Sequence, residues 1–224
     1  PESFFLSPEA AVALLRRGER ALGALTYGWL SMGNPDPAGA RLAEVRGFLR
    51  AHPHVEGLFW DFASLPQKPR SKEEDAMFKR GLEVMADLYA SPAGTVVLRA
   101  QGIPPNSAGV EGYNDRPYPK RGWCIFESSV GLEAVARLGY EKELREGLEK
   151  LPLAKMYDIG KGAATKVAVE RVVGGLKPRY DGIVKRIEGA AFTCGGAEKV
   201  LVVNLFREYG SHLCRPQPRA RLHQ

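Results

Sequence analysis

The sequence has 224 residues, of which 44% are hydrophobic and 26% are charged, and its net charge at pH 7 is +6. This composition is typical of one folded domain and excludes a disordered or fibrous chain. No run of eighteen apolar residues is present, so we expect no membrane-spanning helix and no membrane partner. No secretory signal is visible, and the three cysteines are too far apart for a disulfide framework or a metal site. These features predict a cytoplasmic protein without a metal.

We expect a single domain over residues 1–214, with its core at about 21–160 and a helical extension at about 161–214. The chain begins with Pro1 rather than Met, which suggests a piece of a longer protein. A basic tail follows at 215–224 and holds part of the positive charge. The sequence has no stripe of basic residues interleaved with aromatics, so we do not expect a nucleic-acid partner.

The first part of the chain predicts helix, strand and helix. Ser7 and Pro8 form a helix cap, and the helix should run to about Arg17. Residues 21–30 are small and apolar, as in a buried strand, and the loop at 31–37 is dense in turn formers. An amphipathic helix that ends at Pro53 comes next, with one apolar face made of Leu42, Val45, Phe48 and Leu49.

The strongest strand signal is Val55–Phe62, an apolar and aromatic run of the kind that is covered on both faces in a parallel sheet. Asp61 is out of place in such a run. A loop follows at 63–72, and it is basic from Lys68 onward. The next helix, at 73–89, should bury one face made of Phe78, Leu82, Met85 and Tyr89.

The remaining elements alternate in the same way. A short strand at 95–98 is followed by a long polar loop at 101–118, and loops of this length are usually functional or mobile. The later predictions are helices at 123–138 and 140–151, a strand near 156–159, and helices near 166–173, 179–188 and 197–209. This order predicts an α/β fold with a doubly wound parallel sheet. Its site should lie beyond the carboxyl ends of the strands, where the loops after Trp29, Asp61 and Leu98 meet the start of helix 123–138.

One acidic residue stands out in helix 123–138. At about 100° per residue, Glu127 sits in the middle of a stripe that otherwise holds Trp123, Val130, Ala134 and Leu138. A carboxylate on the inward face of a helix must be paired, neutralised or used, because burying a bare charge is costly. Two interpretations remain open: Glu127 pairs with Arg121 to hold the loop, or it is a functional carboxylate at the floor of a pocket.

Several motifs resemble one known family. Trp123-Cys-Ile-Phe-Glu127 is similar to the Trp-Cys-x-x-Glu motif of TIR (Toll/interleukin receptor) domains, and Tyr118-Pro-Lys-Arg121 takes the place of the segment that precedes it in the plant branch. A TIR-like group of bacterial, algal and protist proteins has motifs that resemble Trp29-Leu-Ser-Met-Gly-Asn-Pro-Asp-Pro37, Trp60-Asp-Phe-Ala-Ser-Leu-Pro-Gln67, Arg121-Gly-Trp-Cys124 and Phe192-Thr-Cys-Gly-Gly-Ala197.

The resemblance covers residues 21–138 and is weaker elsewhere. It implies a flavodoxin-like, TIR-like doubly wound parallel sheet with a helical C-terminal extension. Two departures concern substrate binding more than fold: Gly28 stands where members of this group often carry a basic residue, and the Arg-Gly-x-Asp of the first TIR strand is absent.

TIR domains divide into NAD-cleaving enzymes and assembly modules in signalling and immunity. In the enzymes the Glu of Trp-Cys-x-x-Glu is catalytic, which the resemblance carries over to Glu127, with NAD as a substrate rather than a cofactor. A carboxylate can stabilise the oxocarbenium-like state formed when the ribosyl–nicotinamide bond breaks. The candidate substrate-binding residues are Trp29, Asp61, Ser64, Gln67, Tyr118, Arg121 and Trp123.

Each candidate has a structural alternative. Trp123 and Trp60 are expected in the core. Asp61 is equally explained as a loop-capping acid, and Ser64 and Gln67 as caps of the next turn. Trp29 fits a pocket wall as well as the core. Arg121 would meet a pyrophosphate or pair with Glu127.

Three functions follow from this reading. The preferred one is an NAD glycohydrolase or ADP-ribosyl cyclase, which as a TIR-like domain would act on NAD or a related nucleotide and form homo-oligomers. The alternatives are a non-catalytic TIR-like module that associates through the loop at 64–72, and a nucleoside deoxyribosyl transferase that uses a Glu on the same sheet.

Overall fold

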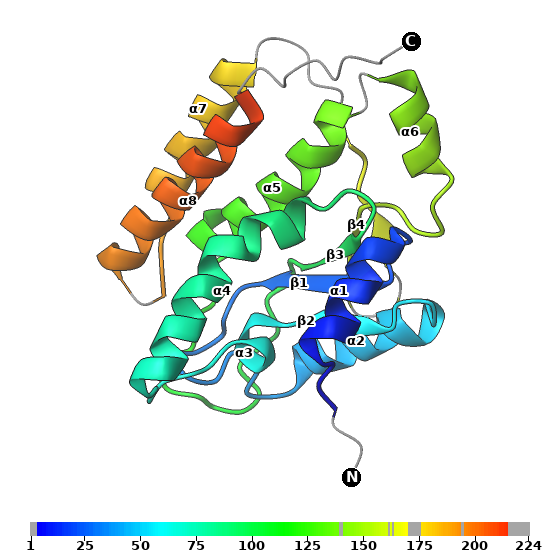
Figure 1. Cartoon of the computed structure of the whole chain (residues 1–224). Helices are drawn as coiled ribbons and strands as arrows, with labels where there is room; N and C mark the ends of the chain where they lie inside the picture. Colours follow the sequence, from blue (N-terminus) through cyan, green and yellow to red (C-terminus); the bar gives the residue numbers. More distant parts are fainter. Residues whose placement is uncertain are drawn as a thin grey trace.

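The structure, a computed structural model, describes residues 4–138, 141–160, 162, 164–169, 176–193 and 195–214. Its centre is a five-stranded sheet in the order β2-β1-β3-β4-β5. The first four of these strands are labelled in Figure 1. The strands are β1 (Leu22–Tyr27), β2 (Gly57–Phe59), β3 (Thr95–Ala100), β4 (Met156–Asp158) and β5 (Thr165–Lys166). The first four pair in parallel, and only β5 pairs antiparallel, with β4. The predicted α/β class with a mostly parallel sheet is confirmed, and the order is consistent with a flavodoxin-like fold.

Helices flank both faces of this sheet (Figure 1). In chain order they are α1 (Pro8–Arg17), α2 (Ala40–Ala51), α3 (Asp61–Ser64), α4 (Lys72–Ala90), the 3₁₀ turn η1 (Tyr118–Lys120), α5 (Gly122–Leu138), α6 (Lys142–Glu149), α7 (Leu176–Glu188) and α8 (Gly196–Cys214). Local signals set several of these ends. The Ser7 hydroxyl caps α1 by accepting from the Ala10 N–H at 3.2 Å, and Ser71 and Glu74 form a capping box at the start of α4.

The two faces of the sheet carry separate hydrophobic clusters. On one face, Val45 and Phe48 of α2 pack with Leu25 of β1 and Leu98 of β3. On the other face, the helices α4 and α5 cover a larger cluster that includes Ala24, Val97, Tyr89 and Phe126. Residues of opposite parity along β1 and β3 thus point into different clusters, as the pleat of a strand requires.

Helix α5 lies between the sheet and the C-terminal helices (Figure 1). Ile187 of α7 and Phe206 of α8 are fully buried in the same cluster as Phe126 and Val130 of α5. Phe206 contacts Phe126 edge-to-face, with 6.4 Å between the ring centroids. The helices α7 and α8 therefore close the outer side of α5, and any polar side chain on α5 is exposed to little water.

The second strand is shorter than predicted. Instead of spanning 55–62, β2 has three half-buried residues and lies at the edge of the sheet. The chain turns at Trp60, whose backbone N–H donates to the Ser64 hydroxyl at 3.1 Å, and Asp61 begins the short helix α3. The apolar run is thus divided between an edge strand and a turn. Its side chains still pack on both faces of the sheet, Phe59 against the larger cluster and Leu58 and Trp60 against the α2 cluster.

Two helix predictions are also wrong in part. The buried face of α2 holds Arg41 with Val45 and Phe48, whereas Leu42 is 39% exposed. Arg41 is accommodated because its guanidinium bonds to the Glu44 carboxylate and to a backbone carbonyl of the loop after β3. The helix expected at 166–173 is absent from its described part, where residues 165–166 form β5 and 167–169 are irregular; the remainder lies outside the described residues. The other predicted helices and strands are confirmed with shifted ends.

Candidate active site

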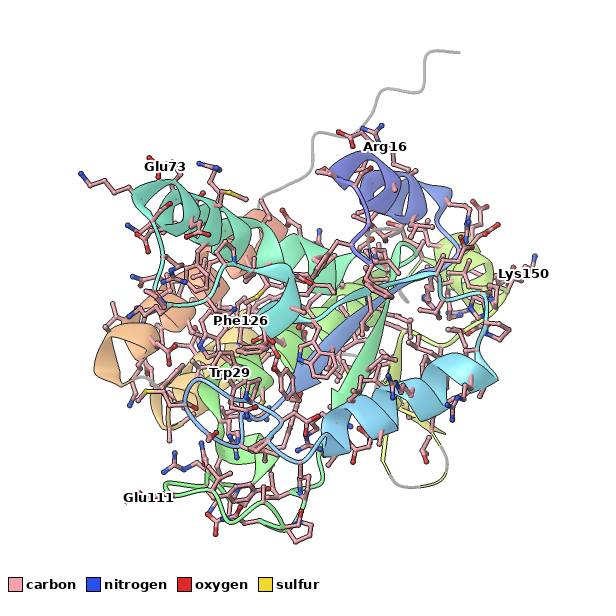
Figure 2. The ribbon with its side chains drawn as sticks, turned by 90° about the horizontal axis from the view of Figure 1, so that it is seen from below. Arg16, Trp29, Glu73, Glu111, Phe126 and Lys150 are labelled. Atoms are coloured by element: carbon pink, nitrogen blue, oxygen red, sulfur yellow. The ribbon has the colours of Figure 1, made fainter. Side chains whose placement is uncertain are left out.

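The carboxyl ends of β1 and β3 form the edge from which the candidate site is built. The chain leaves β1 toward β2 and leaves β3 toward β4, so a topological switch point lies between the two strands. Figure 2 looks onto the molecule from below and shows Trp29 on the loop after β1 and Glu111 on the loop after β3. These two loops are joined where the Asn114 N–H donates to the Leu30 carbonyl at 2.7 Å.

Glu127 lies near the start of α5 and is buried, with 6% of its surface exposed. Burial, and then the charge of nearby Asp61, raise the pKa of its carboxyl well above the usual value, against a hydrogen bond with the Thr26 hydroxyl that lowers it. Thr26 belongs to β1, and its Oγ1 lies 2.7 Å from the Tyr118 hydroxyl. Of the ion pairs between described residues, none involves Glu127 or joins it to Arg121. The carboxylate therefore lies at the switch point with polar but uncharged partners.

A second glutamate on the same helix shows the contrasting arrangement. Glu133 is also buried, and both of its carboxylate oxygens accept from Nε of Arg179 on α7, at 2.6 and 2.8 Å. This pair neutralises Glu133 and joins α5 to α7. Sequence reasoning missed it, because Glu133 lies off the apolar stripe and its burial comes from α7, which is distant in the sequence.

Asp61 ties two loops together at the same edge. Its carboxylate accepts from the Tyr27 hydroxyl and the Trp29 indole N–H, both at 3.0 Å, and from the Phe62 backbone N–H at 2.7 Å. The Trp60 indole N–H extends this network by donating to the Tyr27 hydroxyl at 2.8 Å. Burial raises the pKa of Asp61 in spite of these bonds. The contacts are those of a loop-capping acid, and they also hold the Trp29 ring in place.

Arg121 is a clamp on the backbone in this structure. It is 5% exposed, and its three nitrogens donate to the carbonyls of Trp29, Asn114 and Arg116 at 2.6–2.7 Å. The guanidinium passes so close to Gly28 that a Cβ at that position would stand 2.4 Å from Nε of Arg121. The missing basic residue at position 28 thus has a physical reason: glycine leaves the space that Arg121 occupies.

The other predicted side chains are engaged within the protein. Tyr118 is buried, and its hydroxyl lies between Thr26 Oγ1 and the Cys124 carbonyl. Ser64 accepts within the α3 turn, and the Gln67 side chain donates to the Leu65 carbonyl at 2.9 Å in the same segment. The polar groups of Ser64 and Gln67 thus make the turn-capping contacts of the structural alternative.

The two tryptophans expected in the core are half-buried and pack against it. Trp123 packs against the larger cluster and meets Phe126 edge-to-face, with 5.9 Å between the centroids. Trp60 packs against the α2 cluster and meets Tyr27 edge-to-face at 5.8 Å. Trp29 is half-buried as well, with its ring against Phe62 at 5.6 Å.

The motif at 121–124 contacts the trailing segment that begins at Phe192. Arg121 and Ala191 form a parallel bridge, in which the Gly122 N–H donates to the Ala191 carbonyl at 3.0 Å. The Phe192 ring lies directly on Gly122, where a Cβ would be 1.9 Å from the ring. The two motifs lie seventy residues apart in the sequence, between Gly122 and Phe192, yet they form one structural unit. Gly122 is needed for the contact because any side chain there would overlap the ring.

Sequence reasoning also missed Thr26 and Tyr27. They close an apolar strand and carry no motif, so the only signal was their place at the carboxyl end of β1. Both are buried, and they supply the hydroxyls that meet Glu127 and Asp61. The site is thus a cluster of two carboxylates and three hydroxyls, the third being that of Tyr118.

Two hollows on the described surface lie beside η1, and neither is lined by Glu127 or Asp61. Within the described ranges, no group of three histidine, cysteine or acidic side chains is placed to hold a metal ion. None of the helices in that same part of the chain is long and apolar enough to cross a membrane. No protein-family model matches the chain, and neither a curated protein nor a solved structure does. Function must therefore be inferred from the site itself.

Proposed function

We propose that this chain is a TIR-like enzyme that cleaves NAD between nicotinamide and ribose, with Glu127 as its catalytic carboxylate. One observation carries the proposal: Glu127 is buried at the switch point of the sheet without a cation among the described residues to neutralise it. Burying an unpaired ionised carboxylate is costly, and at this position the cost appears as a raised pKa of Glu127. Glu133, on the same helix, is buried with Arg179 as its ion-pair partner and needs no such explanation.

The chemistry suits a single carboxylate. The C1′–N1 bond of NAD breaks, its electrons leave with nicotinamide, and positive charge develops on the ribose ring. An ionised Glu127 next to that charge stabilises the oxocarbenium-like state. Addition of water to C1′, with loss of a proton, gives ADP-ribose; attack by an adenine nitrogen gives a cyclic product.

The protonation state of Glu127 fits this role. Burial raises its pKa, so the carboxyl holds a proton more readily than an exposed glutamate does. A cationic nicotinamide ring nearby has the opposite effect and favours the ionised form. The Thr26 hydroxyl also lowers the pKa of Glu127 and so favours the ionised form, as the bound substrate would. Binding of NAD would thus itself ionise the catalytic group.

Access to Glu127 requires movement, because only 6% of the residue is exposed. The bonds from Tyr27 and Trp29 to Asp61 tie the loop after β1 to the segment after β2. Separating them would open this edge and free the Trp29 ring to stack on a base or on nicotinamide. Assembly of several copies in the cytoplasm would trigger this change, since homo-oligomers are expected for a TIR-like domain.

The experiment is to incubate the concentrated protein with NAD and to separate the products by chromatography. Nicotinamide with ADP-ribose or a cyclic product, lost in Glu127→Gln, supports the proposal. A parallel incubation with free deoxynucleosides tests for deoxyribosyl transfer. If bases are exchanged between the deoxynucleosides and no nicotinamide is released from NAD, the protein is a deoxyribosyl transferase and the proposal of NAD cleavage is wrong.

A second candidate, a non-catalytic association module, is favoured by the segment at 64–72. Arg70 stacks over the Phe78 ring at 3.7 Å and pairs with Asp75, which fixes the segment, while Lys68 and Lys72 are exposed. This candidate predicts concentration-dependent assembly that is lost when Lys68 and Lys72 are both changed to Glu. It also predicts that no NAD is consumed.

A further inference from the structure

The two surface hollows adjoin one another and share Arg116 and Lys120 among their lining residues. The first has a volume of about 630 Å³ and lies between the segment 112–117 and Phe192. The second has a volume of about 450 Å³ and extends to the last turn of α7. Ligand pockets commonly have volumes of about 300–1,000 Å³, so the first hollow is large enough for a small molecule.

The charges around the hollows are strongly one-sided. Their lining residues include four cations, Arg116, Lys120, Lys185 and Arg186, against the single carboxylate of Asp115. All four cations are exposed, and none forms an ion pair with another described residue. Lys185 and Arg186 offset the dipole at the end of α7, but that effect does not account for Arg116 and Lys120.

The acids of α7 are engaged elsewhere. Asp181 pairs with Lys177 at 3.0 Å, and Glu188 pairs with Arg207 at 2.9 Å. The helix thus directs its carboxylates to other cations and leaves Lys185 and Arg186 free beside the second hollow.

The backbone that carries the two shared cations is fixed. The Arg116 carbonyl accepts from Nε of Arg121 at 2.7 Å, and the Lys120 carbonyl accepts from the Ala191 N–H at 3.0 Å. The Phe192 ring in the first hollow is held in place against Gly122. A ligand would therefore meet a fixed backbone and a fixed aromatic ring, and only the side chains of the cations would have to be ordered on binding.

We propose that these hollows form a binding site for a ligand with a chain of two or more phosphate groups. One phosphate neutralises about two cations, so a single group would leave half of this set unpaired. The Phe192 ring beside the first hollow offers a face for a nucleobase, which favours a nucleoside polyphosphate. The site differs from the one at Glu127 and does not depend on NAD cleavage.

The test is calorimetric titration of the folded chain with AMP, ADP, ATP, inorganic triphosphate and adenosine. Affinity should rise from AMP to ATP, adenosine should not bind, and the dissociation constants should increase with salt. Tighter binding of ATP than of inorganic triphosphate identifies a nucleotide site. Equal binding identifies a site for the polyphosphate chain alone.

The variant Lys120→Glu/Lys185→Glu should weaken ATP binding by at least about tenfold. The neutral variant Lys120→Gln/Lys185→Gln should weaken it in the same direction and provides a second test if charge reversal impairs folding. Arg46→Glu/Arg50→Glu, two exposed cations on α2, is the matched control and should bind normally. The proposal would be overturned if ATP did not bind at low salt, or if both lysine variants bound ATP as tightly as the parent. It would also be overturned if a single-stranded oligonucleotide bound more tightly than ATP when the affinities are compared per phosphate group.

Discussion

The hydroxyl of Thr26 on β1 lies close enough to the carboxyl of Glu127 on α5 to lower the pKa of that group. It opposes, without cancelling, the effect of burial and of Asp61 on the pKa of Glu127. A hydroxyl is a weaker partner for a carboxylate than the Arg179 guanidinium that pairs with Glu133. Glu127 is thus positioned by the fold but not neutralised by it.

The first prediction concerns stability as a function of pH. Because the folded pKa of Glu127 is raised, the folded state binds this proton more tightly than the unfolded chain does. Stability from this group is therefore lost as pH rises from the ordinary value of 4.5 to the raised folded value. Glu127→Gln is neutral at every pH, so its unfolding free energy should exceed that of the parent increasingly across this window. Urea unfolding at a series of pH values measures the difference.

The exposed Glu83→Gln on α4 is the matched control and should follow the parent at each pH. Asp61 also has a raised pKa and its charge acts on Glu127, so Asp61→Asn and the double variant with Glu127→Gln are measured beside it to separate the two groups. A Glu127→Gln variant that is less stable than the parent at every pH would mean that the carboxylate has a stabilising partner.

The second prediction concerns the pH dependence of turnover. An ionised Glu127 is required, so activity should fall as pH decreases, with a midpoint above that of an ordinary glutamate. Thr26→Val removes the hydroxyl that favours ionisation and should move the midpoint to still higher pH. Initial rates of nicotinamide release across pH give both midpoints. Equal midpoints for the parent and Thr26→Val would refute the role assigned to this hydroxyl.

The third prediction tests the close approach of Gly28 and Arg121. An alanine Cβ would stand 2.4 Å from Nε of Arg121, so the guanidinium must move and lose bonds to backbone carbonyls. Gly28→Ala should lower the unfolding free energy by about 2 kcal/mol or more. Gly47→Ala, at a helical position with open space, should raise it by about 0.5–1 kcal/mol. If Gly28→Ala unfolds like the parent, Arg121 does not act as a clamp.

The fourth prediction concerns the ion pair between Glu133 and Arg179. Arg179→Met leaves a buried carboxylate unpaired and should cost about 2–4 kcal/mol of stability, toward the lower end because the Arg179 side chain is 32% exposed. Adding Glu133→Leu should restore much of this loss. Thermal or urea unfolding of the single and double variants gives the coupling energy. A coupling energy near zero would contradict the assigned role of the pair.

Periodicity and cap residues in the sequence predicted most of the fold. Three local signals are confirmed by the structure: the Ser7–Pro8 cap of α1, the apolar face of α4 that ends at Tyr89, and the buried strand β3 that begins at Thr95. The errors arose where tertiary contacts decide. Residues 55–62 look like a central strand, but β2 is an edge strand, and edge position is not encoded in local hydrophobicity.

The inward position of Glu127 could be predicted because this residue lies within the apolar stripe of its helix. Its environment could not. The hydroxyl of Thr26 and the carboxylate of Asp61 come from other segments, and the buried cation Arg41 looks like a surface residue in the sequence. The role of Gly28 was also inaccessible, because it depends on the path of the Arg121 side chain.

The most direct test of the central claim is the rate of nicotinamide release from NAD by the concentrated protein and by Glu127→Gln. We expect release by the parent and a decrease of at least about a hundredfold in the variant, with its fold intact by circular dichroism. Equal release by the two proteins would contradict the catalytic role of Glu127. No release by the parent, even under crowding that forces assembly, would contradict the proposed enzyme and favour the association module.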